Sequence, residues 1–237
     1  MRGSAALLLL LLACACDPGT APAEQVAEKA AEKAAAIVDP PPAAAEPLAK
    51  GRYAPRNECV EIADATDFRQ QIIEAVQLRD TDALLQLVAD DVKLDFGGGA
   101  GKAELRKRLG DPALGLWRKL DALLPLGCAK GAQGGITIPW IFAQDPPVDP
   151  FAGMLVTGED VSVLPRPVAT AAPIGTVSWD VVEVTGFEPE AAFQRIMLPD
   201  KREGFIASDK LRSLVDYRLL ASSRNGVWSV TSFVAGD

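Results

Sequence analysis

The chain has 237 residues, of which 49% are hydrophobic and 24% charged, with a net charge of −8, four cysteines and no histidine. This length allows one large or two small domains with a core of their own, and the acidic balance argues against nucleic acid as a partner, because phosphate binding needs a basic face. The lack of histidine excludes Ser-His-Asp and Cys-His catalytic pairs, histidine general bases and histidine-ligated zinc.

Residues 1–13 have the layout of a signal peptide. Arg2 gives a positive start, and Ala5 to Leu12 form an apolar run. Signal peptides carry an apolar stretch of roughly 7–15 residues, whereas a bilayer span needs about 20. The sequence therefore predicts export rather than a transmembrane helix.

Leu11-Leu12-Ala13-Cys14 resembles the lipobox of bacterial lipoproteins. In that family the cysteine is acylated and the preceding peptide is removed, so the resemblance implies that Cys14 carries the lipid. Ala15 would then follow the lipid, which implies sorting to the periplasmic face of the outer membrane. The alternatives are acylation of Cys16, where the following Asp17 implies inner-membrane retention in some bacteria, or an ordinary signal peptide cleaved nearby.

Residues 14–56 differ in composition from the rest of the chain. Ala23 to Val38 is rich in helix-forming Ala, Glu and Lys but has no apolar stripe, and prolines follow at 40–42, 47 and 55. Proline runs stiffen and extend a chain. The segment is predicted to be a spacer between the lipid and the folded part.

Residues 57–150 are expected to form a mainly helical α+β domain. Helices are predicted after Asp64 or Thr66, after Asp80, over 102–109 and after Asp111-Pro112, which has the pattern of a cap followed by a first-turn proline. Alternating apolar residues predict strands at Val92–Phe96 and Ile136–Phe142. Over 65–125 this order resembles the front half of the nuclear-transport-factor-2-like cone fold, which also hosts ketosteroid isomerases.

Residues 158–212 resemble a bacterial Src-homology-3-like (SH3-like) β-barrel, a module common in cell-envelope proteins. The match includes VSVLPRPVATAAPIGTVSWDVVEV from Val161 and GFIASDKL from Gly204. It implies a binding surface at Pro165–Pro173 and Ala191–Arg202, with Trp179, Phe193 and Phe205 as candidate binding aromatics. The sequence departs from the family at Asp180, where Gly is usual, and at Phe205 and the Ala192-Phe193 region, where Trp is usual. The other interpretation is that the three aromatics belong to the barrel core.

Residues 213–237 are predicted to form a β-hairpin around Asn225-Gly226, the strongest two-residue hairpin signal. The barrel does not need this hairpin. The hairpin resembles the last two strands of the cone fold. One hypothesis is that 217–234 pairs with 135–143, in which case the barrel is inserted into a discontinuous α+β domain; the alternative is that the barrel simply follows the α+β domain.

Few residues suggest chemistry. Gly97–Lys102 fails as a phosphate loop, because Phe96 stands where the first glycine belongs and Ala103 replaces the Ser or Thr. Asp95 is the one carboxylate worth testing, since it precedes that glycine turn. Cys59 and Cys128 are expected to pair, as exported thiols usually do.

The sequence thus predicts a non-enzymatic, lipid-anchored envelope lipoprotein without cofactor, metal or catalytic residues. Its expected partners are the membrane, through the lipid, and cell-wall peptidoglycan or an envelope protein, through the barrel. The alternatives are a cone domain that binds or converts a small apolar ligand behind Trp117 and Trp140, and a structural assembly subunit.

Overall fold

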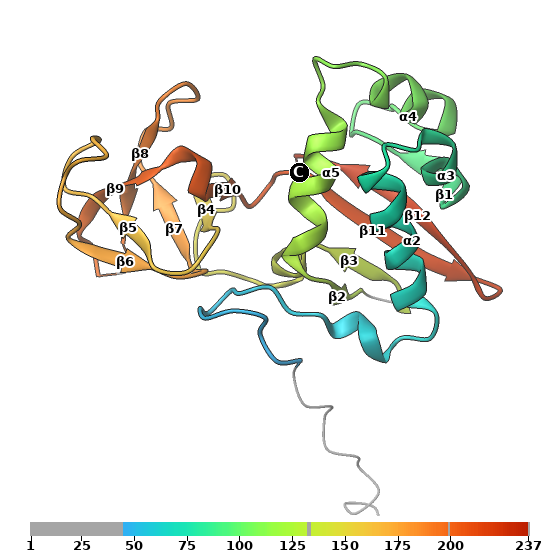
Figure 1. Ribbon diagram of the computed structural model, residues 1–237, viewed down its shortest axis with the longest axis horizontal. Helices are drawn as coiled ribbons and strands as arrows, with labels where there is room; N and C mark the ends of the chain where they lie inside the picture. The colour runs from blue at the N-terminus through green and yellow to red at the C-terminus, as the bar shows by residue number, and fades with distance from the viewer. Residues whose placement is uncertain (1–44, 132–133, 199, 237) are drawn as a thin grey trace, which may run out of the picture. The chain divides into compact units, whose positions relative to one another are not determined.

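A computed structural model describes residues 45–131, 134–198 and 200–236 (Figure 1). The signal peptide, Cys14, Cys16 and most of the predicted spacer lie outside the described residues. Helices and sheets are both present, so the fold class is α+β. None of the helices in the described ranges is long and apolar enough to cross a bilayer.

The first part of the fold, which we call the body, has a helical layer. The sequence predicts most of these helices, and Asp80 caps one of them by accepting a hydrogen bond from the Ala83 amide at 2.9 Å. The helices are η1 (Glu58–Glu61), α2 (Ala65–Gln77), α3 (Thr81–Gln86), α4 (Lys102–Leu109), α5 (Leu116–Leu123) and η2 (Leu124–Leu126).

The predicted start of α5 at Asp111-Pro112 is wrong. The helix begins after Gly115, whose φ of 57° lies in the left-handed region that favours glycine. The Asp111 side chain accepts from the Ala113 amide at 2.9 Å and so closes a local turn. An aspartate that bonds to its own neighbouring backbone in this way competes with helix formation.

The body contains a five-stranded sheet, and α2 and α5 lie across one of its faces (Figure 1). Its order is β1 (Val88–Lys93), β12 (Val227–Val234), β11 (Arg218–Arg224), β3 (Ile136–Ile138) and β2 (Ala129–Lys130). Strands β1 and β12 are parallel, and the other pairs are antiparallel. Leu219 on β11 lies opposite Ile138 on β3, which confirms the predicted pairing of 135–143 with 217–234.

The prediction for the hairpin turn is confirmed, whereas those for two neighbouring strands are partly wrong. Asn225 and Gly226 have φ of 54° and 80°, as a tight two-residue hairpin turn requires. The predicted strand to Phe142 ends at Ile138, because Pro139 has no amide hydrogen to continue the ladder, and Trp140–Ala143 form a 3-10 turn, η4. The predicted strand Val92–Phe96 has the wrong bounds, because β1 begins at Val88 and ends at Lys93; Phe96 lies beyond it and is 50% exposed.

The core of the body joins the helical layer to the sheet. Buried residues from helices, sheet and disulfide form one apolar cluster. Its largest fully buried side chains are Ile72, Val76, Val92, Leu123, Ile136, Ile138 and Leu219.

The second part, the inserted module, is a β structure. Its sheet has the order β10 (Leu211–Ser213), β4 (Gly153–Val156), β7 (Val181–Val184), β8 (Phe193–Met197) and β9 (Glu203–Ala207), with η5 (Ser208–Lys210) before β10. A second pair, β5 (Val161–Val163) and β6 (Gly175–Val177), is linked to β9 by the bridge from Leu164 to Phe205. In the part of the chain that the structure describes, this ladder does not close into a barrel.

Strand β4 lies before residue 158, where the sequence predicts the start of the module. It pairs with both β10 and β7, so the module needs it. Its sequence Gly-Met-Leu-Val is a short apolar run without alternation, which gives no strand pattern to read.

The last ten residues of the predicted spacer belong to the fold, so the expected boundary at residue 57 is too late. We call residues 47–56 the strap. Tyr53 and Ala54 are buried. The Tyr53 amide donates to the Trp179 carbonyl of the module at 2.7 Å, and the Cys128 amide of the body donates to the Arg56 carbonyl at 2.7 Å.

Candidate binding groove

Two of the three predicted binding aromatics come together. Phe193 lies on β8 and Phe205 on the neighbouring β9, where Arg195 is the register partner of Phe205. Both aromatic side chains are partly exposed, and both line a groove of about 520 Å³ on the module. The groove is also lined by Pro167, Thr185, Gly186, Glu188, Ala191, Ala192, Gln194, Arg195 and Glu203.

Trp179, the third predicted aromatic, does not line this groove. It has a φ of 41°, and its amide donates to the Gly158 carbonyl at 2.9 Å. Its side chain packs against a separate apolar cluster that contains Tyr53 and Trp140. The sequence resemblance could not foresee this, because Trp179 is held by the strap, whose composition is that of a spacer.

The charged groups at the groove pair only loosely. The Arg195 guanidinium lies 5.6 Å from the centre of the Phe205 ring, and its nearest carboxylate oxygen is Glu203 Oε2 at 3.8 Å. Both side chains of this pair are more than half exposed, so the ion pair contributes little to stability. Arg195, Glu203 and Glu188 are therefore available to contact a ligand.

One wall of the groove is a loop, residues 185–192, that is fastened by a buried glutamine. Gln194 is 2% exposed. Its amide oxygen accepts from the Glu188 amide at 3.1 Å, and its Nε2 donates to the Glu188 carbonyl at 2.6 Å and to Ser208 Oγ at 3.1 Å. Ser208 Oγ in turn donates to the Ala191 carbonyl at 2.5 Å. These bonds hold the loop on β8 and η5.

Sequence reasoning missed Gln194, although a signal exists. In the strand Phe193-Gln194-Arg195-Ile196-Met197, Gln194 stands two residues from the buried Ile196 and so shares its inward face. A polar residue at an inward position must have hydrogen-bond partners. Its partners lie on a loop and on η5, which the sequence alone does not bring together.

A polar atom beside the groove has no partner. Thr185 Oγ1 is shielded from solvent and makes no hydrogen bond to the described residues. The Thr185 backbone is fixed, because its amide donates to the Arg195 carbonyl at 3.0 Å. The Thr185 hydroxyl can therefore take a new hydrogen-bond partner while the backbone amide keeps its own.

Exposed apolar side chains are found in the segments that form the groove. Val168 follows the lining residue Pro167, and Phe187 lies between the lining residues Gly186 and Glu188. Ile174, immediately before β6, comes close to Gly204 on β9. Large exposed apolar residues concentrated around a concavity are typical of binding surfaces.

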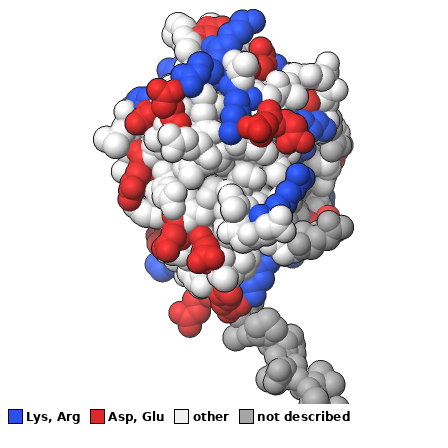
Figure 2. All heavy atoms as spheres, turned by 90° about the vertical axis from the view of Figure 1, so that its right-hand side faces the viewer, with Lys and Arg blue, Asp and Glu red and all other residues white. Residues whose placement is uncertain are grey.

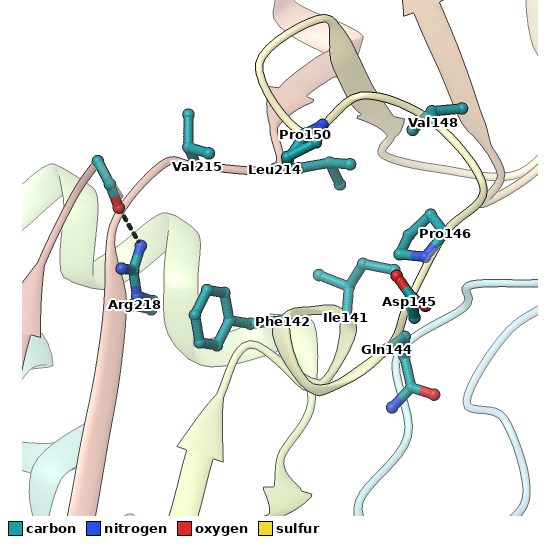
Figure 3. Close-up of a pocket in the computed structure, with 11 residues that line it drawn as sticks. Ile141, Phe142, Gln144, Asp145, Pro146, Val148, Pro150, Leu214, Val215 and Arg218 are labelled. Atoms are coloured by element: carbon teal, nitrogen blue, oxygen red, sulfur yellow. Dashed lines mark hydrogen bonds between the residues drawn. The ribbon is translucent and has the colours of Figure 1, made fainter.

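A smaller cavity of about 170 Å³ lies beside the connecting segments 141–150 and 214–218 (Figure 3). Leu214 and Pro150 lie across from Ile141 and Phe142 there. Arg218, which is 7% exposed, donates to the Gly236 carbonyl, and its guanidinium lies 4.3 Å from the Phe142 ring centre.

This small cavity is not the apolar pocket expected behind Trp117 and Trp140. Neither tryptophan lines it. Trp117 packs against the body core, while Trp140 is buried and its Nε1 donates to Glu58 Oε1 at 2.7 Å. The two tryptophans pack in different apolar clusters, Trp117 against the body core and Trp140 beside Tyr53 and Ile141.

Asp95, the carboxylate that the sequence points to, is engaged in the glycine turn. Its Oδ1 accepts from the Gly97 and Gly99 amides at 2.8 and 2.7 Å, and its Oδ2 accepts from Arg108 at 2.5 Å. The Arg108 hydrogen bond, followed by that of the Gly99 amide, lowers the pKa of Asp95 below 3.8. A carboxylate with a lowered pKa is a weak base, so this geometry assigns Asp95 to holding the turn.

The basic cluster Arg106-Lys107-Arg108 is interleaved with carboxylates. Arg106 pairs with Asp82 at 2.6 Å, and Arg108 pairs with Asp95 and with Glu104. In the upper part of the face in Figure 2, Lys and Arg side chains lie beside Asp and Glu. This mixture fits a solvated helix face better than an anion or lipid site.

The cysteines of the folded part, Cys59 and Cys128, are joined in a disulfide with their Cα atoms 5.8 Å apart. Both residues are fully buried, at η1 and immediately before β2. The bond ties the start of the body to its sheet. Elsewhere in the described ranges, no three Cys, Asp or Glu side chains come together as metal ligands would.

Comparison of the chain with protein-family models found no match, and comparison with curated proteins found none either. The groove therefore has to be interpreted from its own geometry.

Proposed function

We propose that the protein is a lipid-anchored lipoprotein of the cell envelope, without enzymatic activity, whose inserted module binds cell-wall peptide or an envelope protein. The lipid on Cys14 holds it at the periplasmic face of the outer membrane. The spacer keeps the folded part away from the bilayer, and the module presents the groove.

The observation that carries this proposal is the open groove that Phe193 and Phe205 line from adjacent strands. Aromatic side chains that stay partly exposed on adjacent strands, beside charged groups in loose pairs, provide apolar contact and polar selectivity together. The clamped loop adds a wall that does not have to be ordered when a ligand binds, which lowers the entropic cost of binding.

The strand order supports assigning the module to the SH3-like class. The segments 161–163, 175–177, 181–184, 193–197 and 203–207 are strands at the places that the resemblance implies, and a 3-10 turn follows at 208–210. The groove lies beside the two surfaces that the resemblance implies for binding, Pro165–Pro173 and Ala191–Arg202.

The absence of enzymatic activity in this proposal is supported by how the carboxylates are used. Asp95 is held by Arg108 and the glycine turn, at a lowered pKa. Asp145, at the small cavity, is exposed rather than buried, and a catalytic acid or base generally needs a shielded site. The small-ligand alternative has no comparable observation in its favour.

The proposal is tested by co-sedimentation with purified peptidoglycan sacculi. The chain is extracted from membranes in mild detergent and compared with the F193A/F205A variant. We expect the wild type to pellet and the variant to lose at least roughly tenfold in affinity, since aromatic anchors typically contribute more than 1 kcal/mol each.

The matched control is F151A, because Phe151 is an exposed phenylalanine that does not line the groove. This variant should pellet like the wild type. In-cell crosslinking followed by pull-down tests for a protein partner with the same variants. Wild-type protein that neither pellets nor crosslinks through the groove would contradict the proposal.

A further inference from the structure

We infer that Thr185 is the hydrogen-bonding contact of the groove for an extended cell-wall peptide, and that Gln194 and Ser208 position the loop that carries the contact. This inference rests on the proposed function and deepens it. It starts from the unpartnered hydroxyl of Thr185.

Buried hydroxyl groups almost always have a hydrogen-bond partner, and leaving one unpaired is unfavourable. Three side-chain atoms in the described residues are buried without a partner: Arg56 Nε, Arg69 Nε and Thr185 Oγ1. Among these three residues, Thr185 is the one that lines the groove. Both arginines retain other polar atoms that are bonded, whereas Thr185 has a single side-chain polar atom.

The Thr185 side chain can turn toward the groove that it lines without any movement of the backbone. Thr185 is partly exposed as a residue, although its Oγ1 is not. Rotation about χ1 moves the oxygen between staggered positions. The main chain stays in place during this rotation, because the Thr185 amide is bonded to the Arg195 carbonyl on β8.

The chemistry around Thr185 fits a peptide group. A hydroxyl can both donate and accept, so it can pair with either the N–H or the C=O of a peptide. Phe193, Phe205, Ala191 and Ala192 supply apolar surface on the same groove. An extended peptide offers both features at once, with its backbone against Thr185 and small apolar side chains against the aromatic floor.

The hydrogen bonds of Gln194 and Ser208 to loop 185–192 explain why Thr185 is held in position. Gln194 bonds to the amide and the carbonyl of Glu188, and Ser208 bonds to the Ala191 carbonyl. The main chain is therefore fixed at both ends of the turn from Glu188 to Ala191. Thr185 stands at the beginning of the same loop. Gln194 and Ser208 are thus positioning residues, while Thr185 is the contact.

The test compares T185V, T185S and wild type in the full chain, extracted in mild detergent, by co-sedimentation with sacculi and by thermal unfolding. Valine has the shape of threonine without the hydroxyl. We expect T185V to bind about three- to tenfold more weakly, as for the loss of one hydrogen bond, with an unchanged or raised Tm. T185S keeps the hydroxyl and should restore most of the affinity.

The matched control is T176V, because Thr176 is an exposed threonine on β6 that does not line the groove. It should bind like the wild type. The S208A variant separates positioning from contact: it should weaken binding and also speed hydrogen exchange of the amides at 188–191, whereas T185V should leave that exchange unchanged.

T185V that binds as tightly as the wild type would overturn the inference and leave the proposed function standing. A parallel loss of Tm and affinity in T185V would also overturn it, since it would indicate a structural role. Wild-type protein that fails to bind sacculi would overturn both, and groove-dependent crosslinking to a protein would then identify a protein ligand instead.

Discussion

Asp95 shows how a carboxylate that looks chemically interesting in a sequence can be used to hold a turn. It has three hydrogen-bond donors within reach: two glycine amides and Arg108. A β-carbon on Gly99 would come 2.1 Å from Asp95 Oδ2, so the side chain fills the space inside the glycine turn. The glycines of this segment make room for Asp95 rather than for a phosphate.

The pH dependence of stability should carry the signature of Asp95. Its pKa in the folded state is lowered from 3.8, so its contribution is present above that pH and is lost as the pH falls through the folded-state value. We expect D95N to melt below the wild type at pH 7 and the two Tm values to converge below about pH 3.8. Thermal scans from pH 7 to pH 3 measure this.

The control for that series is D91N, which changes an exposed carboxylate on β1. It should follow the wild-type profile. A constant difference in Tm between D95N and wild type across the whole range would show that the ionised form of Asp95 has no special role.

Gly51 is the tightest point of the strap. A β-carbon there would lie 2.1 Å from the Ser178 carbonyl oxygen, and its φ is 128°. We expect G51A to destabilise the protein by about 1–3 kcal/mol, through strain and displacement of the strap. Urea unfolding measures the loss, and faster proteolysis near residues 47–56 should accompany it.

Gly98 provides the matched comparison, because it too has a positive φ, of 100°, but a β-carbon added there would meet no atom within 4 Å. G98A therefore reports backbone strain alone and should cost about 1–2 kcal/mol, less than G51A. Equal losses in the two variants would mean that the strap yields to the alanine at no cost.

At the scale of elements, the disulfide is the strongest single constraint on the body. It closes a loop with a sequence separation of 69 residues. In the chain-entropy view, a loop of this length contributes about 4 kcal/mol. We expect the C59A/C128A variant to lose up to that amount in urea unfolding, and the wild type under reducing agent to behave similarly.

Reducing agent on the C59A/C128A variant is the internal control and should change nothing further in the folded part. If the reduced wild type unfolds at the same urea concentration as the oxidised protein, the body does not depend on this bond.

Several elements could be predicted from the sequence because their signals are local. The periodic apolar positions give α2, and Asn225-Gly226 gives the final hairpin, whereas the alternation from Val92 to Phe96 marks only the last two residues of β1. Strand β4 and the true start of α5 could not be predicted. Gly153–Val156 has no alternation, and the Asp111 turn satisfies local hydrogen bonds that a helix cap would otherwise use.

Some residues of the groove could likewise be predicted from the sequence, and others could not. Phe193 and Phe205 follow from a resemblance in sequence, because neighbouring strands bring them together. Thr185, Gln194 and Ser208 depend on how a loop, a strand and η5 meet, and no local pattern encodes that meeting. Trp179 lies away from the groove because it contacts the strap: its carbonyl accepts from the amide of Tyr53, which lies 126 positions earlier in the chain.

At the scale of the whole molecule, the module is inserted at a single place in the body. Met154 on β4 pairs with Ser213 on β10, so the two ends of the insertion lie side by side. We expect a chain in which residues 154–213 are replaced by a short Gly-Ser linker to keep the folded body at reduced stability. The main core of the body contains no residue of the module, but Trp140 and Ile141 would lose their packing against Leu155 and Val181. Circular dichroism and protection of the Cys59–Cys128 bond from reductant measure this.

The opposite deletion should be destructive. Removing residues 218–237 takes away β11 and β12, which stand between β1 and β3 in the sheet. We expect this chain to lose the cooperative unfolding transition of the body, although it lacks few residues. A cooperative transition of wild-type size in that chain would contradict the assignment of the central strands.

The predicted lipid site belongs to this scale as well. We expect C14S to shift the protein from the membrane fraction to the soluble periplasmic fraction, and C16S to leave it in the membrane. Fractionation with mass analysis of the mature N-terminus checks both. Retention of C14S together with release of C16S would move the lipid to Cys16, and with it the expected membrane.

The central place of β11 and β12 also bears on how the chain would mature during the export that we propose. Strand β3 can pair with β11 only after synthesis has reached Leu219, 81 residues after its register partner Ile138. A polypeptide that emerges from its N-terminus onward must therefore keep the apolar face of its first helices uncovered while the whole module passes through. Such long-range pairing is slow, and until it is complete the chain exposes apolar surface that is prone to aggregation. In the export that we propose, the module would therefore be able to fold before the body, and the body would stay prone to aggregation until β11 arrives.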